Sequence, residues 1–269
     1  MAVNVEKVYT SACKALRFTV ETTMEDPKLW DEFYVSILND PASYKDIPPW
    51  CYYAAIINQC KTQIASNSGR GSALTAAKNL LKQSKALYKE DKENLQKAWM
   101  YDGKQYMVNG FYGVILNDPI PGVPMHPEGK VGFENFDTII NNAKRNANKE
   151  YMSEELSAAY LSKYIKEAKA CYPDSFTYKG DAPMIFVHNT LVRAEYLKDM
   201  LTLLPNAKIY ITTTSNAPFL PLYFESSSGV GVLMCINYHT YFLENFENKY
   251  PFVKIPDEAR KYFKVEDED

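Results

Sequence analysis

Two dipeptides, Asp102-Gly103 and Asn109-Gly110, constrain the fold of this chain more than any other feature of its sequence. Each separates two short runs of β-prone residues, and the three runs cover residues 98–101, 104–108 and 111–116. Asp-Gly and Asn-Gly are the pairs that two-residue type I′ hairpin turns prefer, because both central residues of that turn need a positive φ. The sequence therefore predicts a three-stranded antiparallel meander in the middle of the chain.

A helix precedes this meander, and the same order of elements recurs nearer the C-terminus. Residues 72–88 have the apolar spacing of an amphipathic helix, and so do residues 191–204. A strand is expected before the second helix, at 184–189, and three after it, at 208–214, 220–226 and 230–237. An internal duplication is the simplest account of this order. We expect an α+β fold of βαβββ repeats, with both helices on one face of a curved antiparallel sheet.

The rest of the chain is expected to be mainly helical. In residues 1–66, Val8, Ala12, Leu16 and Val20 share one helix face, and Asp26 before Pro27 is a typical helix start. Residues 50–64 are apolar on nearly all sides and are expected to be buried. The predicted domains are a helical section at 1–66, an α+β domain at 67–237 with a helical insertion at 133–170, and an extension at 238–269 with an acidic tail.

Composition excludes several classes of protein. No apolar stretch approaches the roughly 20 residues that a membrane-spanning helix needs, and the N-terminus lacks the apolar core of a signal peptide, so a cytoplasmic protein without membrane contact is expected. The five cysteines form no CxxC pair, which argues against a zinc site. The three histidines, His126, His188 and His239, have no metal-binding spacing. Neither GxxxxGK[ST] nor GxGxxG occurs, so no cofactor is expected.

Residues 191–237 contain three distinctive phrases: Tyr196-Leu197-Lys198-Asp199, Pro221-Leu222-Tyr223-Phe224 and Val232-Leu233-Met234. With these phrases the segment resembles the last unit of the bacterial sliding clamp, the β subunit of DNA polymerase III. Two departures stand against it. Cys235 follows Met234 where the family tends to have proline, and the chain is too short for three clamp domains, so a ring would require a homo-oligomer of more subunits.

The resemblance implies a non-enzymatic clamp-like protein associated with double-stranded DNA or with replication proteins. Clamps face DNA with basic side chains on helices. The corresponding residues here are Lys78, Lys82, Lys85 and Lys89 on the first helix, with Arg193 and Lys198 on the second. The alternative for the lysines is an ordinary solvated helix face, since the middle of the chain carries only a small basic excess.

Two other functions stay open at the level of sequence. One is a protein-interaction or scaffold module without DNA binding, and the other is a hydrolase with an unrecognised site such as Cys171 with His188. The aromatic segment 238–246 either packs back onto the sheet or binds a partner. DNA binding needs a continuous positive face, a scaffold needs an exposed apolar patch, and an enzyme needs a pocket with convergent polar groups.

Overall fold

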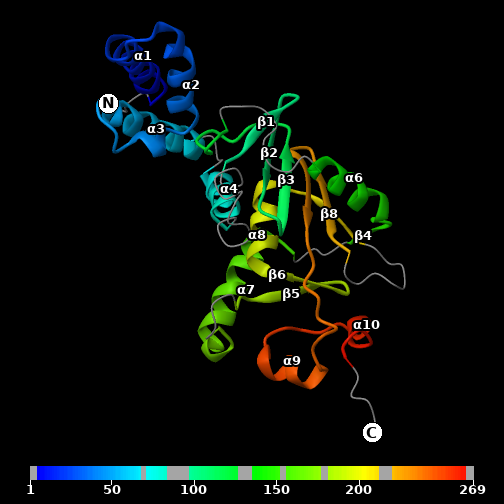
Figure 1. Cartoon of the computed structure of the whole chain (residues 1–269). Coiled ribbons are helices and arrows are strands. Elements are labelled where there is room, and N and C mark those ends of the chain that lie inside the picture. Colours follow the sequence, from blue (N-terminus) through cyan, green and yellow to red (C-terminus); the bar gives the residue numbers. More distant parts are fainter. Residues whose placement is uncertain are drawn as a thin grey trace. The chain divides into compact units, whose positions relative to one another are not determined.

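The computed structural model of the chain describes residues 5–67, 71–83, 97–126, 135–151, 156–176, 181–211 and 220–264 (Figure 1). The chain divides into two compact units. Unit 1 comprises Met1–Asn109 and Leu116–Glu134, and unit 2 comprises Gly110–Ile115 and Asn135–Asp269. This division runs through the region 67–237 that the sequence assigns to one α+β domain.

Unit 1 is mainly helical. Its elements are α1 (Val5–Thr23), the 3₁₀ turns η1 (Pro27–Leu29) and η2 (Pro41–Tyr44), α2 (Trp30–Asn39), α3 (Cys51–Asn67), α4 (Gly71–Gln83) and the strands β1 (Trp99–Tyr101) and β2 (Lys104–Val108). The predicted N-cap at Asp26 is confirmed, because its carboxylate accepts a hydrogen bond from the backbone N–H of Lys28 at 2.9 Å.

The core of unit 1 follows the predicted face of α1. Ala12, Leu16 and Val20 are buried, whereas Val8 is 37% exposed at the first turns of the helix. The expectation that the third helix is buried on all sides is wrong, because Tyr52 is 67% exposed. Residues of α3 that point toward α1, such as Ala54, are buried, so α3 is a surface helix with one core face.

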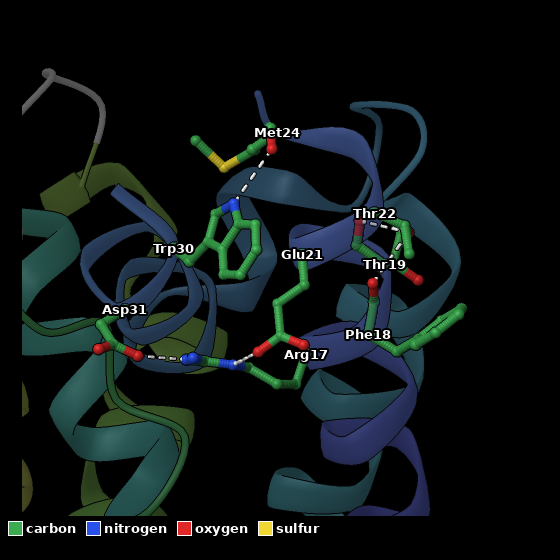
Figure 2. A network of polar contacts seen from close by, with 8 residues as sticks. All are labelled: Arg17, Phe18, Thr19, Glu21, Thr22, Met24, Trp30 and Asp31. Atoms are coloured by element: carbon green, nitrogen blue, oxygen red, sulfur yellow. Dashed lines mark hydrogen bonds and ion pairs between the residues drawn. The ribbon is translucent and has the colours of Figure 1, made fainter. Parts of the chain in front are cut away.

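Polar contacts join α1 to the segment that follows it (Figure 2). The Arg17 guanidinium lies 2.5 Å from Glu21 Oε1 in the same helix and 2.5 Å from Asp31 Oδ1 in α2. The indole N–H of Trp30 donates to the carbonyl of Met24 at 3.0 Å. These contacts fix the turn between the helices, although ion pairs at exposed positions contribute little free energy.

The first predicted hairpin turn is confirmed, and the second dipeptide joins β2 to β3 (Tyr112–Leu116) as predicted, but without the backbone of a type I′ turn. Asp102 and Gly103 have φ of 49° and 70°, and β1 and β2 pair antiparallel on either side of them. In the second dipeptide Gly110 has φ 89°, but Asn109 does not have a positive φ. The buried side chain of Asn109 instead donates to the carbonyl of Leu80 in α4 at 3.2 Å, so packing fixes this residue.

Unit 2 is built on an antiparallel sheet with the strand order β3-β9-β8-β7-β4. Its elements are the strands β3 (Tyr112–Leu116), β4 (Lys149–Tyr151), β5 (Met184–Val187), β6 (Thr190–Arg193), β7 (Lys208–Ile211), β8 (Leu222–Ser226) and β9 (Gly229–Leu233), with the helices α6 (Phe136–Asn146), α7 (Ala158–Cys171), α8 (Ala194–Leu203), α9 (Leu243–Lys249) and α10 (Asp257–Arg260) and the turn η4 (Pro173–Phe176). The predicted helix 191–204 starts later than expected, because its first residues form β6, which pairs with β5. The predicted helical region 133–170 likewise contributes β4 to the sheet.

Helices lie on both faces of this sheet. On one face α8 approaches β9 closely: a side chain on Gly231 would lie 2.4 Å from Met200 Cε and 3.0 Å from Leu204 Cδ1. On the other face Lys144 of α6 pairs with Glu225 of β8 at 3.1 Å. The α+β class is therefore confirmed. A helix followed by three strands is present at α8-β7-β8-β9. The equivalence of this unit to a clamp repeat stays a prediction.

The C-terminal segment packs on the β5–β6 hairpin. Tyr238 and Phe246 are fully buried in a cluster with Phe186 of β5, at ring-centroid distances of 5.2 and 6.5 Å. The Tyr238 hydroxyl donates to the carbonyl of Asn189 in the hairpin turn at 2.7 Å. Of the two interpretations of segment 238–246, packing is therefore the one that the structure confirms, although its partner is a hairpin and not the main sheet.

Candidate functional site

The basic residues of α4 face solvent. Lys78 and Lys82 are exposed, and neither forms an ion pair with the residues that the structure describes. Leu74, Ala77 and Leu81, on the neighbouring face of α4, are buried. Lys85 and Lys89, the other half of the predicted stripe, lie outside the described residues.

The two predicted basic residues of unit 2 are held by neighbouring side chains. The Arg193 guanidinium lies 5.3 Å from the centroid of the Tyr196 ring and donates to its hydroxyl at 3.3 Å. Lys198 Nζ lies 3.7 Å from Oδ1 of the buried Asp199. These contacts give both cations a structural role at the start of α8, and they weaken the case for a DNA-facing surface there.

Lys61, a half-buried lysine, lines a hollow of about 450 Å³ in unit 1. Burial lowers the pKa of Lys61. A lowered pKa is common among lysines at functional sites. The Lys61 ammonium, however, donates to the carbonyl of Leu38 at the end of α2. Lys61 thus satisfies a helix C-terminus, which explains its position without a ligand.

A groove of about 930 Å³ lies in unit 2. Its walls come from α7 and the residue that follows it, from the β5–β6 hairpin, from residues 251–258, and from Tyr151 of β4 and Leu156. We call it the aromatic groove because six aromatic residues line it: Tyr151, Tyr160, Tyr164, Tyr172, Phe186 and Phe252.

The spacing of residues on α7 builds one wall of the aromatic groove. Tyr160, Tyr164 and Ala168 follow each other at intervals of four, so they share one face of the helix, and Tyr172 is the residue directly after its end. Ser157 starts the helix, with its hydroxyl accepting a hydrogen bond from the N–H of Tyr160 at 3.1 Å. The rings of Tyr160 and Tyr164 are stacked, with planes 19° apart.

Phe252 holds the opposite wall in place. Its ring contacts four other aromatic rings, with centroid distances of 6.3 Å to Tyr164, 5.6 Å to Tyr172, 5.3 Å to Phe176 and 6.1 Å to Tyr250. The Tyr164 hydroxyl donates to the carbonyl of Met184 in β5 at 2.5 Å, and burial raises the pKa of Tyr164. The wall is therefore fixed before any ligand binds, while Tyr160 and Tyr172 are each 39% exposed.

Polar residues also line the aromatic groove. Cys171 and His188, the predicted nucleophile pair, both line the groove, yet no hydrogen bond joins them. His188 Nδ1 instead lies 3.0 Å from Asn189 Oδ1. Within the described ranges, no three His, Cys, Asp or Glu side chains are grouped to hold a metal ion, and no helix has the length and apolar character to cross a membrane.

The chain was compared with protein-family models, with curated proteins and with solved structures, and none of them matches it. The candidate site therefore rests on its own geometry. Sequence reasoning missed the aromatic groove, although the four-residue spacing of the tyrosines on α7 is visible in the sequence.

Proposed function

We propose that this protein is a non-enzymatic interaction module that holds a short segment of a partner protein in the aromatic groove. One observation carries the proposal: a preformed groove with partly exposed tyrosines, backed by rings that are already fixed. Tyrosine is enriched among the residues that dominate binding energy at interfaces, because its ring buries a large apolar area at low entropic cost.

The charges of the groove favour a peptide over a nucleic acid. Glu167 and Glu258 line it together with one lysine, Lys254. Nucleic acids bind through neutralisation of their phosphates, which requires an excess of basic side chains. A peptide with apolar side chains and a basic residue complements these walls.

The test is selection from a library of random peptides of about twelve residues, followed by calorimetric titration of the selected peptides. The variant Tyr172→Ala should weaken binding by roughly tenfold or more. Tyr52→Ala is the matched control, since Tyr52 is an exposed tyrosine on α3, outside the groove. Failure to select any peptide, or equal affinity of the two variants, would contradict the proposal.

A second candidate function is association with double-stranded DNA by a clamp-like protein. The observation in its favour is the pair of exposed lysines on α4, which meet no acidic partner in the described part of the chain. The proposal includes replication proteins as partners and a homo-oligomer that encloses DNA.

DNA association is tested by binding to a labelled linear duplex and to a closed circle over a range of salt concentrations. Binding should weaken steeply with salt and disappear when Lys78, Lys82, Lys85 and Lys89 are all changed to Glu. Absence of binding at low salt would rule out this candidate and leave the peptide groove unaffected.

A further inference from the structure

The β5–β6 hairpin is a two-stranded sheet, and its hydrogen-bond pattern shows which backbone groups point outward. Val187 and Thr190 flank the two-residue turn, and the N–H of Ala194 donates to the carbonyl of Pro183 at 2.9 Å. Backbone groups along an antiparallel strand alternate in direction. Residues 183, 185 and 187 therefore face β6, and Met184 and Phe186 direct their N–H and C=O away from it.

Two hydrogen bonds locate the outward edges. On the β6 side, the carbonyl of Leu191 accepts from the N–H of Ile236 at 2.7 Å, so the C-terminal segment covers that edge. On the β5 side, the carbonyl of Met184 accepts from the hydroxyl of Tyr164. Because Tyr164 lines the aromatic groove, the outer edge of β5 opens into the groove.

Phe186 is the second residue of β5 that directs its backbone N–H and C=O away from β6. It lines the groove and is 8% exposed, and its N–H and C=O meet no hydrogen-bond partner in the described residues. A buried backbone group without a partner is costly, and exposed strand edges are the usual sites of strand addition. The open edge is short. The Tyr164 hydroxyl, which binds the carbonyl of Met184, limits it on one side. The turn at His188, where φ is 57°, limits it on the other.

We propose that the partner segment binds in an extended conformation as a third strand beside β5, hydrogen-bonded to the N–H and C=O of Phe186. The inference rests on the proposed peptide-binding function and adds the mode of binding. Main-chain hydrogen bonds supply affinity in this mode, while alternate side chains of the segment meet the pockets beside the edge. The partner segment is an extended peptide with apolar side chains. It also carries a basic residue, which complements Glu167 and Glu258.

The experiment is an N-methyl scan of the tightest peptide selected from the random library. Methylation of one backbone nitrogen removes one N–H donor. Because Phe186 offers one outward C=O, strand addition predicts a roughly tenfold loss at a single position of the peptide, whose N–H donates to that carbonyl, and little loss at the two adjacent positions. A helical peptide would be sensitive at several consecutive positions, and a peptide held by side chains alone would have no such sensitive position.

Amide hydrogen exchange of the full chain provides the second measurement. The Phe186 amide should exchange fast in the free protein and slow by roughly tenfold or more when the peptide is added. The amides of Ile185 and Val187, which face β6, are the internal controls and should be slow in both states.

The outcomes separate the two proposals. Peptides that bind without one sensitive backbone nitrogen, or a Phe186 amide that is already protected in the free protein, would overturn strand addition and keep the groove as a binding site. If no peptide is selected, the proposed function fails and strand addition fails with it.

Discussion

The outward faces of α4 and α7 use the same helical spacing but have different surroundings. On α4, Lys78 and Lys82 point into solvent beside the buried face of their helix. Tyr164 of α7 and Tyr172, the residue after its end, meet a second wall, in which Phe252 contacts both rings. A row of like residues is therefore a weak sign of a site until another element encloses it, because enclosure is what fixes side chains and removes water from the ligand.

The largest effect is expected from Phe252→Ala, which tests whether the second wall is as rigid as its ring contacts indicate. Loss of contacts to four aromatic rings should lower the free energy of unfolding by about 3 kcal/mol. Urea denaturation measures the change. Phe18→Ala is the control, because Phe18 is 67% exposed on α1 and projects away from the helix (Figure 2). Equal effects of the two substitutions would show that the wall is not packed.

Thiol labelling should follow occupation of the groove. Cys171 is exposed and lines it, so a bound peptide should slow alkylation of Cys171 by roughly tenfold. Burial raises the pKa of Cys235 to about 11, so at about pH 8 its reactive thiolate is scarce with or without peptide. Mass spectrometry of both sites reports the result. An unchanged rate at Cys171 would place the peptide elsewhere.

A smaller effect, with a defined pH dependence, is expected from Tyr164→Phe. Loss of the hydrogen bond to Met184 should cost about 1 kcal/mol at neutral pH. Burial raises the pKa of Tyr164 above its ordinary value of 10.0, so the folded state binds the phenolic proton more tightly than the unfolded state. That stabilisation is complete below about pH 10 and is lost as the pH rises through the folded pKa.

Chemical denaturation at about pH 8 and about pH 11 checks this sign. The free energy of unfolding of the unmodified protein should fall between the two values, and that of Tyr164→Phe should fall less. A steeper fall in the variant would mean that Tyr164 is not the group that titrates.

The smallest effect is expected on the solvent face of α4. Lys78→Ala and Lys82→Ala together should change the free energy of unfolding by less than about 0.5 kcal/mol, because neither side chain makes a described ion pair. Leu81→Ala, on the buried face of the same helix, is the contrast and should cost about 3 kcal/mol. A large effect at the lysines would reveal an intramolecular role and weaken the DNA candidate.

Local chemistry made part of this structure predictable. The Asp102-Gly103 pair favours positive φ at both residues by itself, and it has them in the structure. The spacing of the apolar residues was enough to predict the buried face of α1. Asn109-Gly110 has the same composition as a hairpin turn but a different backbone, because a distant carbonyl, that of Leu80, binds the asparagine side chain. Tertiary contacts of this kind cannot be predicted from the residues that neighbour Asn109 in the sequence.

The aromatic groove shows the same limit for function. Its tyrosines on α7 can be found by their spacing, but the wall that faces them lies far along the chain, around Phe252. The open edge of β5 depends on the register of the β5–β6 hairpin, and a shift of one residue would turn the N–H of Phe186 inward. Neither property can be derived without the fold.

Assembly of the groove from distant segments has a consequence for synthesis. Phe252 is translated about eighty residues after Tyr172, which at about 5–20 residues per second takes several seconds. During that interval the nascent chain carries the tyrosines and gains the β5 strand, but it lacks the ring that contacts Tyr164 and Tyr172. The aromatic groove is therefore completed late in synthesis.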